Sequence, residues 1–151
     1  IILFQISENR IRGDAKMINQ QQIDIIKKFL IKNLDVNVIY LFGSSVKNTM
    51  RKDSDIDVAF LSDKSVDSFD LFLLSQKLAD LLGREVDLID IKKASTVFQA
   101  QIISTGLVIY SRDDKKRAVF EMVTYKSYAR LNEEREEILN KIKESGSIYA
   151  K

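Results

Sequence analysis

Two short segments of this sequence bring together residues that could bind a metal ion and a phosphate chain. Gly43 and Ser44 end one apolar run, and after ten intervening residues Asp55 and Asp57 open another. A glycine lets a phosphate approach the backbone closely, and a serine adds a short hydroxyl donor. Carboxylates bind Mg²⁺, which in turn binds oligophosphate oxygens. The pattern therefore predicts a site for a nucleoside triphosphate together with a divalent metal ion.

A third carboxylate is expected at the same site. Side chains alternate along a strand, so Asp55 and Asp57 should project from one face, roughly 7 Å apart. Asp87 begins the later apolar segment 86–91 much as Asp57 begins its own, whereas Asp90 falls on the opposite face. Three such carboxylates could share two metal ions. We therefore favour Asp87 over Asp90 as the third ligand.

Plainer interpretations of the acidic segment compete with the metal site. Residues 53–57 could form only a solvated turn, because Asp and Ser are common in turns. Against this, acidic residues within an apolar strand are costly to bury without a counter-charge. A calcium loop of the EF-hand type is excluded, because its obligatory glycine would be Val58 and its final glutamate would be Lys64. The chain also contains no P-loop motif.

The polar connection between the two segments could supply further contacts to phosphate. Ser45 directly follows the Gly-Ser pair, and Lys47, Arg51 and Lys52 place positive charge on the same connection. Each of these cations could instead be a solvated surface residue. The candidate nucleotide-binding residues are therefore Gly43, Ser44, Ser45 and Lys47.

Composition narrows the chemistry that the chain can perform. Its 151 residues include no histidine and no cysteine, so imidazole bases and thiol nucleophiles are excluded, and carboxylates with Mg²⁺ are the simplest alternative. A net charge of +2 gives no general case for binding nucleic acid or a membrane surface. No stretch approaches the roughly 20 apolar residues that span a bilayer. The absence of cysteine fits a reducing compartment, so we expect a cytoplasmic protein that does not act directly on nucleic acid.

Apolar periodicity predicts one α/β domain that ends in a long helix. The predicted strands are 36–42, 56–61, 86–91 and 107–110, and the predicted helices are 18–33, 66–82, 95–105 and 113–143. We assign residues 17–151 to a single domain. Residues 1–16, which precede Met17, are interpreted as a leader, a remnant of cloning or an extra strand.

The predicted C-terminal helix has two unlike halves. Tyr128, Leu131, Ile138 and Ile142 form a stripe at helical spacing, whereas 132–137 is wholly polar. The first half is expected to pack on its own domain. The second half is expected to project and to dock on a partner or on a second copy of the chain.

These segments together resemble the nucleotidyltransferase superfamily that includes DNA polymerase beta. The chain is most similar to the minimal nucleotidyltransferases, the MNT antitoxins that are paired with HEPN-domain toxins. The resemblance covers about 18–143 and is most specific at 41–44, 54–59 and 84–90, while 104–110 also fits. It implies a small mixed β-sheet flanked by helices, with a long C-terminal helix.

The resemblance also implies a role for each candidate residue. Asp55 and Asp57 would bind two Mg²⁺ ions with the nucleotide, and Asp87 would be a metal ligand and the base for the acceptor hydroxyl. Gly43 and Ser44 would contact the β- and γ-phosphates of ATP. One departure is Lys47-Asn48, where members of the family often have a basic residue followed by glycine.

The implied reaction is transfer of AMP to a tyrosine of the cognate HEPN toxin, which inactivates the toxin. The chain has no second domain to hold an acceptor, so a partner protein is expected to present it. Two rival hypotheses remain: an antitoxin that neutralises its toxin by binding alone, and a nucleotidyltransferase for a small molecule. The missing acceptor domain weighs against the small molecule.

Overall fold

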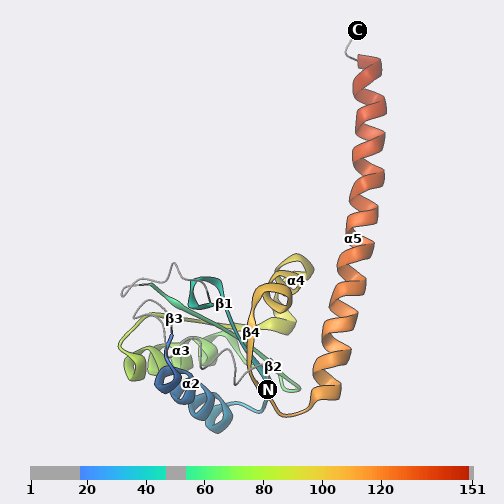
Figure 1. The fold of residues 1–151 in the computed structure, drawn as a ribbon. Coiled ribbons are helices and arrows are strands. Elements are labelled where there is room, and N and C mark those ends of the chain that lie inside the picture. The colour runs from blue at the N-terminus through green and yellow to red at the C-terminus, as the bar shows by residue number, and fades with distance from the viewer. Residues whose placement is uncertain (1–17, 47–53, 150–151) are drawn as a thin grey trace.

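The computed structural model describes residues 18–46 and 54–149, with the backbone alone at 147–149. Figure 1 shows a sheet between two layers of helices, and a last helix that rises away from them. The elements in chain order are α2 (Gln20–Asn33), β1 (Val36–Phe42), the 3₁₀ turn η1 (Gly43–Val46), β2 (Ile56–Ser62), α3 (Ser68–Leu82), β3 (Val86–Asp90), the 3₁₀ turn η2 (Ile91–Lys93), α4 (Thr96–Thr105), β4 (Leu107–Ser111) and α5 (Asp114–Tyr149). The segment 1–16, which we set apart from the domain, lies outside the described residues.

The four strands form one mixed sheet, as predicted, and the structure places them in the order β3-β2-β1-β4. β1 pairs antiparallel with both β2 and β4, while β2 and β3 run parallel. Every residue of β1 is buried, and so is every residue of β2 except Asp57. These two strands are central and covered on both faces, which explains their continuous apolar runs.

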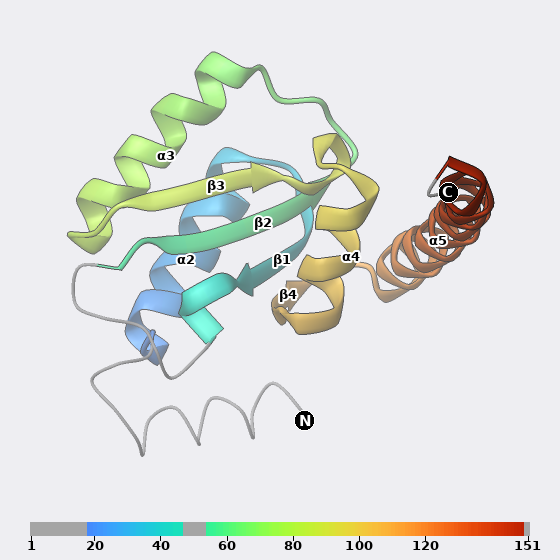
Figure 2. The ribbon, with the colours of Figure 1, turned by 90° about the horizontal axis from the view of Figure 1, so that it is seen from above.

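Each face of the sheet has its own core. On one face, Ile39, Leu41 and Phe60 belong to a cluster that α2 and α3 cover. On the other face, Val38 and Tyr40 belong to a cluster that also includes residues of α4. Figures 1 and 2 show α2 and α3 on one side of the sheet and α4 on the other.

Local signals set the ends of the helices. Asn19 caps α2, because its side chain accepts from the backbone N–H of Gln22 while the Gln22 side-chain oxygen accepts from the Asn19 N–H. α3 begins after Asp67 and ends at Gly83, whose φ of +65° is the left-handed conformation typical of a C-terminal cap. The periodicity therefore located the start of each helix to within about two residues, as is usual for helix ends.

The base of α5 is fixed to the sheet by polar contacts. Arg112, just before the helix, forms an ion pair of 2.7 Å with Asp35. The Tyr40 hydroxyl donates to Glu121 Oε1 at 3.0 Å. Burial, and then the nearby Glu121, raise the pKa of the Tyr40 hydroxyl, so it stays a donor at neutral pH. The first turns of α5 are thus held in a defined direction.

Beyond its base, α5 leaves the domain. The helix runs six residues past the predicted end at 143, and every side chain from 132 to 146 is exposed. The predicted contrast between a packed first half and a projecting second half is confirmed. None of the helices in the described part of the chain has the length and hydropathy needed to cross a bilayer.

Candidate active site

Two of the three predicted carboxylates lie side by side on neighbouring strands. Asp57 of β2 is in register with Asp87 of β3. Each lies two positions before a residue of the cluster beneath α4, namely Ala59 and Ile89. Residues two positions apart on a strand share a face, so both aspartates project from the α4 face. Asp55 comes just before β2 and is exposed. The structure therefore brings Asp55, Asp57 and Asp87 to one end of the sheet.

The two neighbouring carboxylates affect the ionisation of Asp57. Burial, and then the neighbouring carboxylates of Asp87 and Asp55, together raise the pKa of the Asp57 carboxyl to about 6. Within 18–46 and 54–149, no lysine or arginine forms an ion pair with any of the three. The end of the sheet thus concentrates negative charge that no described cation balances.

This donor set fits a divalent cation, although its side chains do not converge on a single point. Among the described residues, no group of three or more acidic side chains has metal-binding geometry as it stands. Backbone hydrogen bonds fix the strand register, and the register places Asp57 beside Asp87. Rotation about side-chain bonds can then move the carboxylate oxygens by several ångströms and bring them together around an ion. Clustered carboxylate oxygens are the ligands that Mg²⁺ prefers.

Gly43 lies against the central carboxylate. Its φ of +64° is left-handed, and a Cβ at this position would stand 2.3 Å from Asp57 Oδ2. Any other residue would both strain the backbone and displace the carboxylate. The two halves of the sequence pattern, the Gly-Ser turn and the acidic pair, are therefore in direct contact.

The two serines of the η1 turn hold the start of β2. Ser45 is buried, and its hydroxyl accepts a hydrogen bond of 3.0 Å from the Asp57 N–H. Ser44 is half-buried and donates to the Asp55 carbonyl at 3.4 Å, which is a long contact. Ser45 is thus committed to the strand, while the Ser44 hydroxyl is free to reorient. Lys47, the fourth nucleotide-binding candidate, lies outside the described residues.

Arg84 is a positioning residue that the sequence pattern did not single out. Its guanidinium Nη2 donates to the Ser54 carbonyl at 2.8 Å. Next to it, the Glu85 carbonyl accepts from the Ile56 N–H at 2.9 Å. These two bonds fix the backbone on both sides of Asp55. The contact joins residues thirty positions apart, so local periodicity carries no signal of it.

Asp90, the alternative third ligand, has a structural role. It is 3% exposed on the opposite face of β3, and its Oδ1 accepts from the Lys92 N–H at 3.2 Å, which caps the η2 turn. Asp90 cannot join Asp57 from that face. The preference for Asp87 therefore agrees with the strand register.

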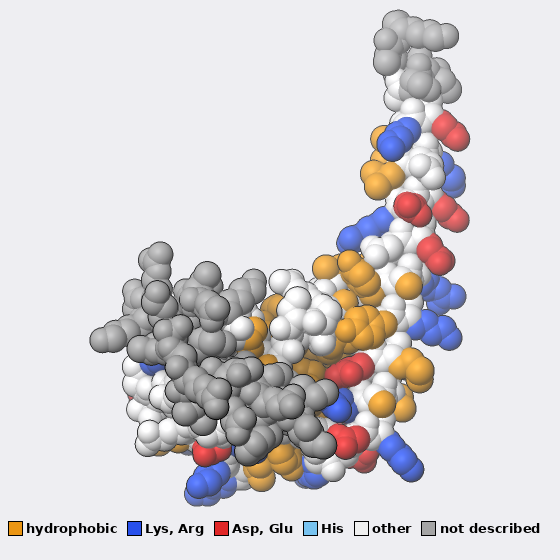
Figure 3. All heavy atoms as spheres, in the orientation of Figure 1, with side chains coloured by type: hydrophobic (Ala, Val, Ile, Leu, Met, Phe, Trp, Pro, Cys, Tyr) orange, Lys and Arg blue, Asp and Glu red, His pale blue; other side chains and the backbone are white. Residues whose placement is uncertain are grey.

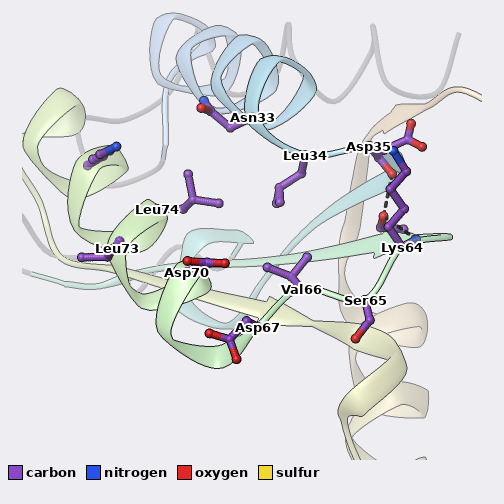
Figure 4. A pocket seen from close by; sticks show the side chains of 12 residues that line it. Asn33, Leu34, Asp35, Lys64, Ser65, Val66, Asp67, Asp70, Leu73 and Leu74 are labelled. Atoms are coloured by element: carbon purple, nitrogen blue, oxygen red, sulfur yellow. Dashed lines mark hydrogen bonds between the residues drawn. The ribbon is translucent and has the colours of Figure 1, made fainter.

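A cavity of about 480 Å³ lies at the other end of β2 and is separate from the carboxylates. Figure 4 shows it between α2, α3 and the segment after β2, with Lys64, Asp67 and Asp70 among its lining residues. It also includes Ser62, the last residue of β2, which is roughly 17 Å along the strand from Asp57. It is not part of the candidate site.

Comparison with known proteins adds independent findings. Residues 24–115 match the family described as polymerase beta, nucleotidyltransferase. The protein adenylyltransferase MntA of Shewanella oneidensis is 36% identical over 120 residues, which are 78% of this chain and 84% of that protein.

Two solved structures have the same fold. One, a toxin–antitoxin crystal structure with AMP-PNP, contains a chain that is 34% identical with a TM-score of 0.73, over 80% of this chain and 97% of that one. The other holds a tri-AMPylated Shewanella oneidensis HEPN toxin in complex with an MNT antitoxin. Its matching chain is 32% identical with a TM-score of 0.69, over 82% of this chain and 97% of that one.

Proposed function

This chain belongs to the polymerase beta nucleotidyltransferase family, and from that premise we propose that it is a protein adenylyltransferase and an antitoxin. In this proposal it transfers AMP from ATP to a tyrosine of a cognate HEPN-domain ribonuclease toxin and so neutralises it. The observation that carries the proposal is the register of Asp57 with Asp87, beside Asp55 and against Gly43. The AMPylated HEPN toxin found with a similar antitoxin supports the choice of acceptor.

Each residue of the site has a part in this reaction. Asp55 and Asp57 would hold two Mg²⁺ ions with the triphosphate, and bound Mg²⁺ supplies charge neutralisation and lowers the pKa of the attacking hydroxyl. Gly43 leaves the backbone open to the β- and γ-phosphates, and Ser44 offers them a hydroxyl. Asp87 accepts the proton of the acceptor hydroxyl as its oxygen bonds to the α-phosphorus and pyrophosphate departs.

The exposure of the site suits an acceptor that belongs to another protein. Asp55 and Asp87 are both exposed, so a side chain from a partner can reach them. A matching chain in each of the two compared structures belongs to a toxin–antitoxin assembly. Because ATP and the toxin must meet the enzyme together, we place the reaction in the cytoplasm.

The experiment that tests this function follows the label from ATP. The chain is incubated with Mg²⁺, its candidate HEPN partner and ATP labelled at either the α- or the γ-phosphate. Only the α-label should appear on the partner, because pyrophosphate leaves. The Asp55→Asn plus Asp57→Asn variant should transfer none.

A matched control makes that loss interpretable. Asp67→Asn plus Asp70→Asn removes two exposed carboxylates at the far end of the sheet and should transfer label at the wild-type rate. Neutralisation of the toxin by the Asp55 and Asp57 double variant at full strength would contradict the proposal. That outcome would instead support an antitoxin that acts by binding alone.

A further inference from the structure

The inner face of α5 continues past the domain on which it packs. A stripe along this face is spaced alternately four and three residues apart and consists of Thr124, Tyr128, Leu131, Arg135, Ile138 and Ile142. Thr124 is buried, and Tyr128 and Leu131 are half-buried, whereas Ile138 and Ile142 are 57% and 59% exposed. Alternating spacings of four and three form the seam by which one helix packs along another. The free end of the stripe, residues 135–142, therefore suits a helix of another body.

This free end rises on the same side of the sheet as the carboxylates. Asp57 and Asp87 project from the face that α4 covers. Figure 1 shows α4 and the projecting part of α5 on that side, with α2 and α3 on the other. A body held against the inner face of α5 would therefore extend over α4 towards the carboxylate end of the sheet.

The α4 helix, which packs against α5, carries no charged side chain. α4 has no acidic or basic residue among its ten, in a chain of which 30% of residues are charged. Val97, Gln101 and Ser104, spaced along one side of the helix, are exposed. Figure 3 shows this region as white and orange spheres beside α5. Depletion of charge is characteristic of the core of a protein interface.

We propose that the acceptor protein docks in the angle between α4 and α5, with one of its helices along residues 135–142. This inference rests on the proposed function, since it names the surface through which the acceptor reaches Asp55, Asp57 and Asp87. The partner helix would pack apolar side chains on Ile138 and Ile142 and place a carboxylate against Arg135.

A second copy of the chain is the weaker occupant. Two copies joined through their distal stripes alone would bury few apolar side chains, which falls short of the roughly 1,000 Å² of a specific interface. Such a contact would also leave the uncharged surface of α4 outside it. A partner seated in the angle contacts both surfaces and lies over the catalytic carboxylates.

The test replaces two exposed apolar residues of the stripe. Ile138→Asp plus Ile142→Asp should weaken binding of the HEPN partner about 100-fold in calorimetry, and transfer of α-label should fall with it. Binding of AMP-PNP with Mg²⁺ and the melting temperature should stay at wild-type values, because both side chains lie outside the core.

The matched control changes two equally exposed apolar residues elsewhere on the helix. Val119 and Met122 are 55% and 64% exposed near the base of α5, and helical geometry places them away from the stripe. Val119→Asp plus Met122→Asp should bind the partner as the wild type does. Loss of binding in this control, or its retention in the stripe variant, would overturn the proposal.

Two further outcomes separate the alternatives. A wild-type dimer in sedimentation that the stripe variant converts to a monomer, with partner binding unchanged, would assign the stripe to a second copy and overturn the proposal. If the wild type binds the partner through the stripe but transfers no label, the result supports the proposed docking surface and contradicts the proposed function.

Discussion

The carboxylate end of the sheet and the distal half of α5 differ in how much of each is fixed by the rest of the molecule. Beside the carboxylates, β1 is wholly buried and β2 nearly so, and the Asp57 backbone is held by Ser45. In α5, every side chain from 132 to 146 is exposed, and the polar contacts described above between this end of the chain and the sheet lie at the base of the helix.

The difference indicates that the two regions have different roles, catalysis at the sheet and recognition of a partner on the helix. Chemistry needs side chains held to a fraction of an ångström, and the packed central strands provide that rigidity. Recognition needs accessible surface, and the projecting helix provides it at little cost to the core. Changes at the sheet end should therefore alter catalysis, while changes on distal α5 should alter binding.

The largest expected effect is on the chemical step. Asp87→Asn should lower kcat for AMP transfer by about 10²–10⁴-fold, because it removes the proton acceptor, while the KM for ATP changes far less. Asp90→Asn, on the opposite face of the same strand, should leave kcat near the wild-type value. Steady-state kinetics measure both, and equal losses in the two variants would contradict the assignment.

A matched pair of glycine substitutions separates backbone strain from displacement of the site. Gly43→Ala and Gly83→Ala both place alanine at a φ near +65°, but only the first puts a Cβ 2.3 Å from Asp57 Oδ2. Each substitution should lower the free energy of unfolding by about 1–2 kcal/mol. Gly43→Ala should also slow AMP transfer about 100-fold, because it moves the Asp57 carboxylate. Similar activity in the two variants would mean that the contact with Asp57 has no catalytic importance.

Burial of Asp57 beside two other carboxylates should weaken the metal-free fold as pH rises. The pKa of Asp57 is raised from 3.8 to about 6, so the folded state favours the protonated carboxyl. The resulting stabilisation is complete below about pH 4 and is lost as pH rises through 6. With an allowance for solvent screening, Asp57→Asn should therefore unfold at a free energy about 1–2 kcal/mol higher than the wild type at pH 7.5 in EDTA.

Denaturant unfolding measures that difference, and Mg²⁺ with AMP-PNP should reverse its sign. The wild type gains binding energy from the ligands, whereas the variant loses part of the site that holds them. A wild type that is more stable than Asp57→Asn in EDTA at pH 7.5 would contradict the raised pKa of Asp57.

The smallest expected effect concerns the free end of α5. Deleting residues 134–151 should shift the melting temperature by less than about 2 °C, because the side chains described in that segment are exposed.

A substitution at the base of the helix serves as the comparison. Tyr40→Phe should destabilise the chain by about 1 kcal/mol, because it removes the hydrogen bond to Glu121 at the base of the helix. Calorimetry compares the two, and a large loss on truncation would show that the distal helix supports the core.

Sequence periodicity could predict the features of the fold that depend on residues close together in the sequence. Alternation placed Asp57 and Asp87 at equivalent positions of their strands, and parallel pairing then put them side by side. Apolar runs on both faces identified β1 and β2 as central strands. Gly83 correctly marked the end of α3. In each case, one or two residues carry the physical reason for the structure.

The remaining features depend on contacts between distant segments. Ser45 is buried with its hydroxyl accepting a hydrogen bond from the Asp57 N–H. Arg84 positions the site because its guanidinium donates a hydrogen bond to the Ser54 carbonyl. The direction of α5 depends on Tyr40 and Glu121, which are 81 positions apart. No pattern within one element contains these pairings, so the sequence alone could not show them.

The most direct test of the metal and nucleotide site counts the ions that it binds. With AMP-PNP present, Mn²⁺ can replace Mg²⁺ and be titrated by electron paramagnetic resonance, and the account predicts about two ions per wild-type chain. Asp57→Asn should bind fewer than one, while Asp90→Asn should match the wild type. Full occupancy in Asp57→Asn would contradict the claim that the carboxylates at this end of the sheet hold the metal and the nucleotide.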